Sequence, residues 1–193
     1  LKIAEGRIED FGPNPVPETV HADTTIDADG AFVAPGFIDV HTHGFLRRSV
    51  QEGPEGLRAM SAELPTSGVT SFLPTLMPLA PDRFPQFVRD CGRATLDPPG
   101  ARMPGLHLEG PFLARTGAIP PDVLRGLDLS YLEKIIDAGG QYMAAMSVSP
   151  DFPDAVALAH RIRETGAKPF VTHTEATFEQ AQALLDAVPE IHG

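Results

Sequence analysis

Residues 37–43 have the sequence Phe37-Ile38-Asp39-Val40-His41-Thr42-His43, a mostly apolar run that becomes polar at its C-terminal end. Pro35-Gly36 directly precedes this run, and such a pair usually interrupts regular structure. Short apolar runs bounded by turn residues are typical of strands buried in a parallel sheet. We therefore predict a parallel strand over residues 37–43 that ends in two histidines.

The same strand pattern recurs along the chain, and helical patterns separate its copies. Four further runs predict strands, at 70–75, 105–110, 142–148 and 169–173. Stretches with helical periodicity alternate with the strands, at 53–66, 81–95, 128–138, 152–165 and 177–188. Strands that alternate with helices in this way predict an α/β fold built from βαβ units with a parallel sheet.

Polar residues close the predicted strands, and no glycine-rich phosphate-binding sequence follows the first of them. Both features favour a (β/α)8 TIM-type barrel over a doubly wound sheet. A complete barrel usually needs about 250 residues, whereas this chain has 193 and predicts about five strands. We therefore expect an incomplete barrel. The start at Leu1 without an initiator methionine, and the stop at Gly193 after a helical pattern, also suggest a fragment of a longer protein.

The N-terminal residues are predicted to form a separate module. Turn sequences separate four short extended segments, at 2–4, 7–8, 24–26 and 31–33. We expect residues 1–35 to form a small β module that is part of a β-sandwich, packed beside the barrel. Residues 36–193 would then be the first part of the barrel.

The composition of the chain excludes several classes of protein. The chain is 42% hydrophobic and 21% charged, a balance typical of a globular protein with a sizeable core. Its 15 basic and 26 acidic side chains give a formal net charge of -11, which would repel nucleic acids and anionic membrane surfaces. We expect neither of them as a partner.

Cys91 is the only cysteine. A single cysteine excludes an internal disulfide framework and a cysteine-based zinc cluster, and it suits a reducing compartment. The sequence has no apolar run of the roughly 18 residues that a membrane span needs, and no signal-peptide pattern at Leu1. We therefore expect a cytoplasmic protein in which Cys91 packs as a small hydrophobic residue.

Three of the predicted strands end in side chains that can bind a metal ion. His41 and His43 are two residues apart, so on a strand both imidazoles project from the same face. Glu109 and His173 end two further strands, and an unpaired buried carboxylate would be costly unless a metal, an arginine or a proton compensated it. Because parallel strands end at one mouth of a barrel, we expect these four residues to converge on a divalent metal ion.

Ordinary structural interpretations also exist for these residues. His41 and His43 could be satisfied polar residues at a strand end. His173 could belong to the entry of the next helix, where a threonine such as Thr177 can cap the helix. His107 has the same strand parity as Glu109 and lies one layer deeper, so we predict a structural, hydrogen-bonded histidine there.

The remaining polar candidates lie outside these strand ends. We expect His21 and His160 to be surface residues, and the role of His192 stays open. Arg47 and Arg48 follow the first predicted strand and could meet an anionic substrate, although a solvated pair of loop residues is the more frequent explanation.

The segments that contain the candidate ligands resemble a known family. The sequence P-G-F-I-D-V-H-T-H-G at 35–44 resembles the first strand of the amidohydrolase superfamily. The segments 68–75, 105–112 and 172–181 narrow this resemblance to the N-acetylglucosamine-6-phosphate deacetylases, over most of the chain. The most specific of them contains H-L-E-G-P-F at 107–112.

This resemblance implies an amide hydrolase that converts N-acetylglucosamine 6-phosphate to glucosamine 6-phosphate and acetate. Glu109, His173 and a further histidine on a sixth strand would hold the primary divalent ion, for which zinc is the first expectation and iron the alternative. Some family members bind a second ion through H-x-H, so His41 and His43 leave a site of one or two ions open. The residues 142–148 contain no lysine that could become a carboxylated metal bridge, as in other amidohydrolases.

The resemblance also places part of the catalytic machinery outside this chain. A catalytic aspartate is expected at the end of an eighth strand, beyond Gly193, so we expect the chain alone to hydrolyse the substrate slowly. The full-length protein is expected to form a homodimer and to take a small amino-sugar phosphate as its substrate.

Two loops depart from the family pattern. Residues 45–49 replace a glycine-rich loop, and the family's substrate-facing histidine corresponds to Ile119. We assign Ala118 and Ile119 to substrate binding on this correspondence. The departures leave two alternatives open: an amidohydrolase that acts on another amide or a cyclic amide, and a truncated, non-catalytic half-barrel that binds metal.

Overall fold

A computed structural model describes residues 1–12, 21–189 and 191 of the chain. The chain divides into two units, Leu1–Pro35 and Gly36–Gly193. His192, whose role the sequence leaves open, lies outside the described residues. In the part of the chain that the structure describes, no helix has the length and apolar character needed to cross a bilayer.

The first unit contains a β-hairpin. Strand β1 (Lys2–Ala4) pairs antiparallel with strand β2 (Arg7–Asp10). Glu5 and Gly6 connect the two strands with φ angles of 49° and 73°. A two-residue type I′ turn requires positive φ at both of its central positions, so this turn sets the register of the hairpin.

The strands predicted at 24–26 and 31–33 do not form. Neither segment pairs with a strand among the described residues. Their apolar side chains find no cover, and Ile26 and Phe32 are 87% and 101% exposed. The prediction of strands at these positions is therefore wrong, because an extended segment becomes a strand only when its backbone groups find a partner.

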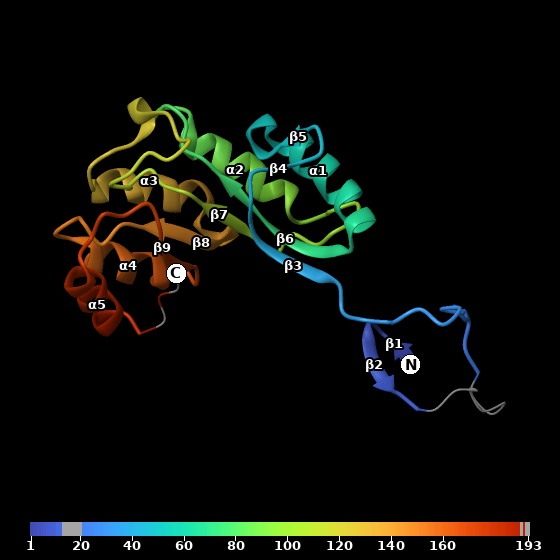
Figure 1. The fold of residues 1–193 in the computed structure, drawn as a ribbon. Helices are drawn as coiled ribbons and strands as arrows, with labels where there is room; N and C mark the ends of the chain where they lie inside the picture. Colours follow the sequence, from blue (N-terminus) through green and yellow to red (C-terminus); the bar gives the residue numbers. More distant parts are fainter. Residues whose placement is uncertain (13–20, 190, 192–193) are drawn as a thin grey trace. The chain divides into compact units, whose positions relative to one another are not determined.

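The second unit is built on a parallel sheet of five strands (Figure 1). Their order in the sheet is their order along the chain, β3 (Phe37–Thr42), β6 (Val69–Leu76), β7 (Leu106–Leu108), β8 (Met143–Val148) and β9 (Lys168–Val171). All four pairings are parallel. The five predicted strands are confirmed, and each connection runs to the neighbouring strand, as in a barrel.

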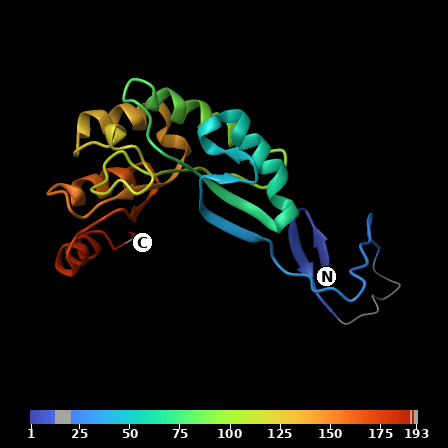
Figure 2. The same cartoon turned by 45° about the horizontal axis from the view of Figure 1, so that its top comes forward.

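Five α-helices match the predicted helical stretches. They are α1 (Pro54–Glu63), α2 (Phe84–Ala94), α3 (Leu129–Gly139), α4 (Ala155–Glu164) and α5 (Phe178–Ala187). Asp128 caps α3, and Thr177 and Gln180 form a capping box at the start of α5. Figures 1 and 2 show α1, α2 and α3 following one another along one side of the sheet.

Short 3-10 helices and one small hairpin complete the unit. The 3-10 helices are η1 (Val50–Glu52), η2 (Leu64–Ser67), η3 (Pro121–Val123) and η4 (Gly140–Tyr142). Directly after β3, the segments β4 (Gly44–Phe45) and β5 (Arg48–Ser49) pair antiparallel, where the sequence predicted a loop. Val50 N donates to His43 O at 2.9 Å, so the hairpin brings the chain back beside His43.

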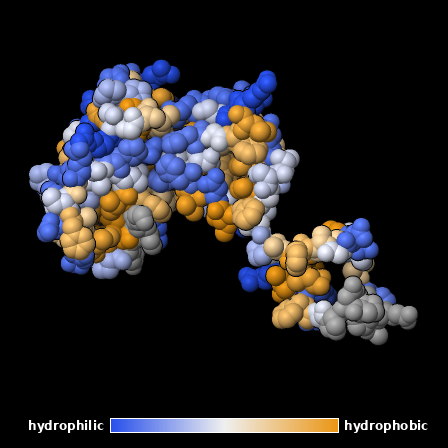
Figure 3. Space-filling view, in the orientation of Figure 1, coloured by the Kyte–Doolittle hydropathy of each residue, from blue (hydrophilic) through white to orange (hydrophobic). Residues whose placement is uncertain are grey.

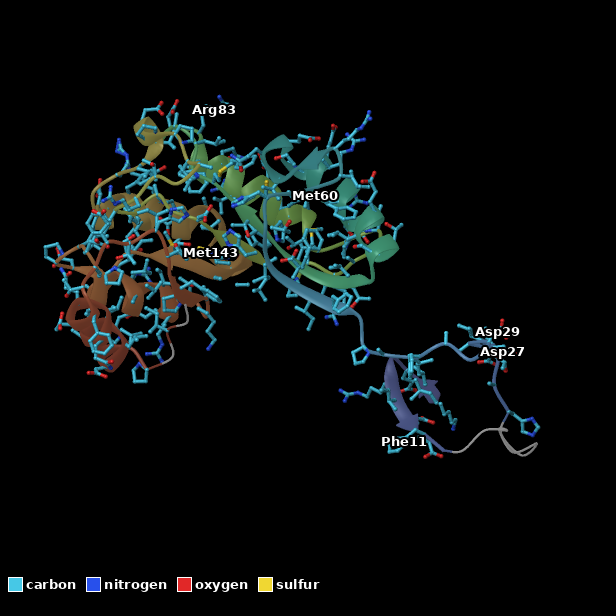
Figure 4. All side chains as sticks on the ribbon, in the orientation of Figure 1. Phe11, Asp27, Asp29, Met60, Arg83 and Met143 are labelled. Carbon is cyan, nitrogen blue, oxygen red and sulfur yellow. The ribbon has the colours of Figure 1, made fainter. Side chains whose placement is uncertain are left out.

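The hydrophobic core lies between the sheet and the helices. Strands β6, β7 and β8 and the helices contribute its fully buried side chains, among them Phe72, Leu76, Leu106, Leu108, Met146, Leu57, Val88, Leu132 and Leu158. Figure 4 shows two further members, Met60 on α1 and Met143 at the beginning of β8. Cys91 is buried in the same core, as predicted, and burial raises the pKa of its thiol to about 12.

Strand β3 forms one edge of the sheet. It pairs with β6 on one side, and no other strand among the described residues pairs with it. Phe37, Ile38 and Val40 are exposed on this strand, and Figure 3 shows apolar side chains along it. An open, apolar edge of this kind is what an incomplete barrel presents.

One glycine gives a test of the helix packing. Gly56 lies within α1, and a Cβ at this position would lie 2.2 Å from Ser49 O. Alanine normally stabilises a helix interior by about 1 kcal/mol relative to glycine. We expect the opposite for Gly56→Ala, a loss of about 1–3 kcal/mol in the free energy of unfolding, because the added methyl overlaps a backbone oxygen. Urea denaturation followed by circular dichroism measures this.

Gly126→Ala is the control for this substitution. A Cβ at Gly126 would meet no atom within 4 Å, so its free energy of unfolding should change by less than about 0.5 kcal/mol. An unchanged or increased stability of Gly56→Ala would contradict the close packing of α1 against Ser49.

Candidate metal centre

The C-terminal ends of three strands bring one carboxylate and three imidazoles together. Glu109 follows β7 directly, and its N–H donates to Leu76 O at 2.9 Å, which continues the pairing with β6 past the end of the strand. His43 follows β3 directly, and His173 lies two residues after β9. Glu109 is only 4% exposed, so its charge depends on these neighbours.

All three imidazoles contact the Glu109 carboxylate. His43 Nε2 lies 3.0 Å from Oε2, and His173 Nε2 lies 3.0 Å from Oε1. His41 Nε2 lies 3.5 Å from Oε1. The ligand atoms of His41, His43 and Glu109 all lie within 4.8 Å of one another, which is close enough for one ion to touch all three.

The hydrogen bonds of His43 show which ring nitrogen is free to bind a cation. Its Nδ1 lies 2.9 Å from Thr75 O, and a carbonyl oxygen only accepts. In a neutral ring, Nδ1 therefore has the hydrogen, and the lone pair of Nε2 is directed at its neighbours. His41 Nε2 lies 3.2 Å from His43 Nε2, beside the carboxylate.

Imidazole lone pairs and carboxylate oxygens repel one another at these distances, so a proton or a cation must lie between them. Imidazole nitrogens and carboxylate oxygens are the donor set that zinc and iron accept in proteins. A carbonyl that holds the second nitrogen of a ligating histidine is also the usual partner in metal sites. The residues present therefore fit a divalent ion.

The electrostatics favour an ionised ligand at the centre of this group. Burial raises the pKa of Glu109, but the hydrogen bond from His43 and the neighbouring imidazoles outweigh burial, and its net pKa lies below the ordinary value. The hydrogen bond to Glu109 raises the pKa of His43. Burial lowers the pKa of His41, in spite of the carboxylate beside it. Glu109 is therefore a carboxylate at neutral pH.

His107 is a buried, hydrogen-bonded histidine, as predicted. Its Nε2 lies 3.2 Å from Ser147 Oγ, and its Nδ1 lies 3.4 Å from Val40 O. Burial lowers its pKa to about 4, so the ring is neutral. Its ring packs edge-on against the His41 ring, with 5.0 Å between the ring centres. His107 therefore supports the orientation of His41.

His173 is separate from the cap of the next helix. Thr177 Oγ1 accepts from Gln180 N at 3.3 Å and so caps α5, while Thr174 Oγ1 donates to Asp151. His173 itself has a φ of 49°, a left-handed conformation that is uncommon for a residue with a Cβ. Thr177 therefore caps the helix, while His173 faces Glu109.

The predicted substrate-binding residues lie on the loop after β7. Ile119 is 2% exposed and Ala118 is exposed. Between this pair and β7, Gly117 packs against the His173 ring, because a Cβ on Gly117 would lie 2.4 Å from His173 Cε1. A glycine in a loop gives no sequence signal for such a contact.

The other polar residues considered in the sequence are exposed, among those that the structure describes. His21 and His160 are exposed, as expected. Arg48 forms an ion pair of 3.7 Å with Glu52, and Arg47 is exposed.

Comparison with known proteins identifies relatives of the chain. It is 34% identical over 162 residues to the N-acetylglucosamine-6-phosphate deacetylase of Lysinibacillus sphaericus, covering 81% of this chain and 42% of the relative. It is 28% identical over 194 residues to the N-acetylgalactosamine-6-phosphate deacetylase of Escherichia coli O157:H7, covering 97% and 49%. No family model matches the chain.

Solved structures give the same result. The crystal structure of N-acetyl-D-glucosamine-6-phosphate deacetylase from Mycobacterium smegmatis matches with a TM-score of 0.72 and 29% identity, covering 80% of this chain and 44% of that one. A mutant of that enzyme, solved in complex with N-acetyl-D-glucosamine-6-phosphate, matches with a TM-score of 0.68 and 28% identity, covering 80% and 40%.

The chain is a relative of the N-acetylglucosamine-6-phosphate deacetylases. The resemblance expected from its motifs is confirmed, and so is the fold class, a five-stranded part of an α/β barrel. The chain spans slightly less than half the length of the curated deacetylases that it matches, 42% and 49% for the two named above.

The geometry of the cluster predicts metal binding that depends on Glu109. We expect the chain to bind zinc, and we expect Glu109→Gln to weaken the affinity by at least about 100-fold, because loss of a direct ligand costs more than loss of an outer partner, which already costs about 10–100-fold. Isothermal titration calorimetry measures both affinities. His160→Ala, on the exposed surface of α4, is the control. Equal zinc affinity in Glu109→Gln and the parent chain would exclude this site.

Proposed function

We propose that the chain forms the metal-holding part of an enzyme that removes the acetyl group from N-acetylglucosamine 6-phosphate. The observation that supports this most is the Glu109 carboxylate, contacted by His41, His43 and His173 at the C-terminal ends of parallel strands. Barrel enzymes place their active sites at this end. The names of the relatives supply the substrate class.

The four residues have distinct places in this proposal. Glu109 and the three imidazoles would hold zinc, with iron as the alternative. A bound divalent ion supplies a Lewis acid for the acetamide carbonyl and a nucleophilic water at neutral pH. The low pKa of Glu109 keeps it a charged ligand, and the Thr75 carbonyl holds the His43 ring with Nε2 turned toward the carboxylate.

The arrangement supports one ion or two. His41, His43 and Glu109 form one compact group, and His173 contacts the same carboxylate at Oε1. If two ions bind, Glu109 and His173 would hold the primary ion, and His41 and His43 would take part in holding the second. Zinc titration of the parent chain, beside His41→Ala and His173→Ala, separates the two cases by stoichiometry.

Two sugars are candidate substrates. The L. sphaericus relative is named for N-acetylglucosamine 6-phosphate and the E. coli relative for N-acetylgalactosamine 6-phosphate. We propose the glucosamine derivative first, because the more similar relative is named for it, and we keep Ala118 and Ile119 as candidate substrate contacts.

Three further parts of the proposal concern the whole protein. We propose a cytoplasmic location, in keeping with a sequence whose single cysteine cannot form an internal disulfide. We propose a homodimer for the full-length protein. We also propose that residues 1–35 contribute to a β-sandwich, for which the hairpin of β1 and β2 is a starting point.

Acetate release tests the function. With the chain in excess over N-acetylglucosamine 6-phosphate labelled in its acetyl group, a single-turnover assay detects slow hydrolysis. We expect zinc-dependent release that is lost in Glu109→Gln and retained in His160→Ala. We expect the rate to be low, because a general acid–base step contributes about 10²–10⁴-fold and its residue is expected on a strand outside this chain.

The same assay distinguishes the alternatives. Faster release from N-acetylgalactosamine 6-phosphate would change the proposed substrate but not the reaction. Release at the same rate by the parent chain and Glu109→Gln would contradict the proposed function, and so would a zinc-loaded chain that releases no acetate above the rate of free zinc.

A further inference from the structure

We propose that Ser149 is a positioning residue that fixes the His173 imidazole on Glu109. Its hydroxyl joins the loop after β7 to the turn after β9. The proposal rests on the proposed metal centre and assigns a role to a residue that does not touch the carboxylate itself.

Ser149 lies at the meeting point of three chain segments. It follows β8 directly and is 0% exposed. Its Oγ accepts a hydrogen bond from Ala114 N at 3.0 Å, in the loop after β7. The same hydroxyl donates toward Thr172 O and His173 O, both at 3.1 Å, in the turn after β9.

A second hydrogen bond joins the loop after β7 directly to the turn after β9. Arg115 N donates to His173 O at 3.0 Å, so the loop after β7 contacts the turn directly as well as through Ser149. Gly117, on the same loop, packs against the His173 ring and leaves no room for a side chain there. The backbone and the ring of His173 are therefore both fixed by the loop after β7.

The conformation of His173 explains why the turn needs these hydrogen bonds. A φ of 49° is disfavoured for a residue with a Cβ, and it persists only where surrounding contacts impose it. This conformation accompanies the 3.0 Å contact between His173 Nε2 and Glu109 Oε1. Without the Ser149 hydroxyl, the two carbonyls lose a buried donor, Ala114 N loses its acceptor, and the strained turn can relax away from Glu109.

Asp151 supports the next residues of the same turn. It accepts from Glu175 N at 2.9 Å and from the Thr174 hydroxyl. Asp151 is partly exposed, so water can replace some of its contacts. Ser149 is fully buried, and its role cannot be taken over in this way.

Ser61 offers a matched control on the same unit. It is also 0% exposed, and its hydroxyl also joins two backbone groups, since Oγ donates to Ala101 O at 2.8 Å and accepts from Gly100 N at 3.1 Å. Gly100 and Ala101 precede β7, whereas Ala114 follows it. The hydrogen bonds of Ser61 therefore lie on the N-terminal side of β7, and those of Ser149 on its C-terminal side. Ser61→Ala therefore removes a similar pair of buried hydrogen bonds at a distance from the metal centre along the strand.

The test compares Ser149→Ala, Ser149→Thr and Ser61→Ala with the parent chain. Zinc affinity is measured by competition with a chromophoric chelator, and cobalt(II) absorption reports the geometry of the ligands. Melting temperature reports stability. We expect Ser149→Ala to weaken zinc binding by about 10–100-fold and to change the cobalt spectrum. Ser149→Thr keeps the hydroxyl and should restore affinity even if its methyl lowers stability. Ser61→Ala should lose stability but keep its zinc affinity.

Parent-like zinc affinity and cobalt spectrum in Ser149→Ala would overturn the proposal, and so would an equal loss of affinity in Ser61→Ala. If the parent chain binds no zinc, the proposed function fails, and the imidazole signals of His173 in the metal-free chain still decide on Ser149. Those signals should shift in Ser149→Ala and stay unchanged in Ser61→Ala. Unchanged signals in Ser149→Ala would overturn the proposal in that case. Should Ser149→Ala not fold, Ser149→Thr decides, because altered His173 signals in a variant that keeps the hydroxyl would show that the hydroxyl does not hold the turn.

Discussion

The burial of one carboxylate constrains the arrangement around the strand ends. Glu109 cannot remain charged in an apolar barrel without partners, and three imidazoles supply them, from the end of β3, the residue after it and the turn after β9. These segments are far apart in sequence, and a parallel sheet brings them together because all of its strands end at the same edge. The hairpin after β3 and the loop after β7 then hold the histidine backbones in place.

The sequence was sufficient to predict the strands and the side chains that contact Glu109. Apolar runs with polar ends predict β3, β6, β7, β8 and β9, because strands of parallel sheets are usually apolar along most of their length. The candidate ligands follow from their place at the ends of these runs. The segments at 24–26 and 31–33 show the limit of this approach, because a strand also needs a partner that the pattern of one segment cannot supply.

Ser149 and Gly117 could not be predicted in the same way. A serine after a strand and a glycine in a loop are common, and their meaning comes only from the turn that contacts them. Their contacts join residues 24 to 56 positions apart along the chain, between Ser149 and His173 and between Gly117 and His173. The pattern of neighbouring residues in the sequence gives no signal for such contacts. The candidate metal ligands are different, because a histidine or a glutamate at a strand end is recognisable from its residue type alone.

The open edge of β3 has a consequence for how the isolated chain behaves at high concentration. No second strand among the described residues pairs with β3, and its exposed apolar side chains can attract other extended segments at short range. The net charge of -11 opposes this attraction by repulsion between molecules. Repulsion of this kind acts over a Debye length of about 8 Å at physiological ionic strength and shrinks as salt is added, whereas the apolar attraction does not. Colloidal stability of the chain therefore depends on ionic strength, and it is greatest in dilute buffer well above the isoelectric point.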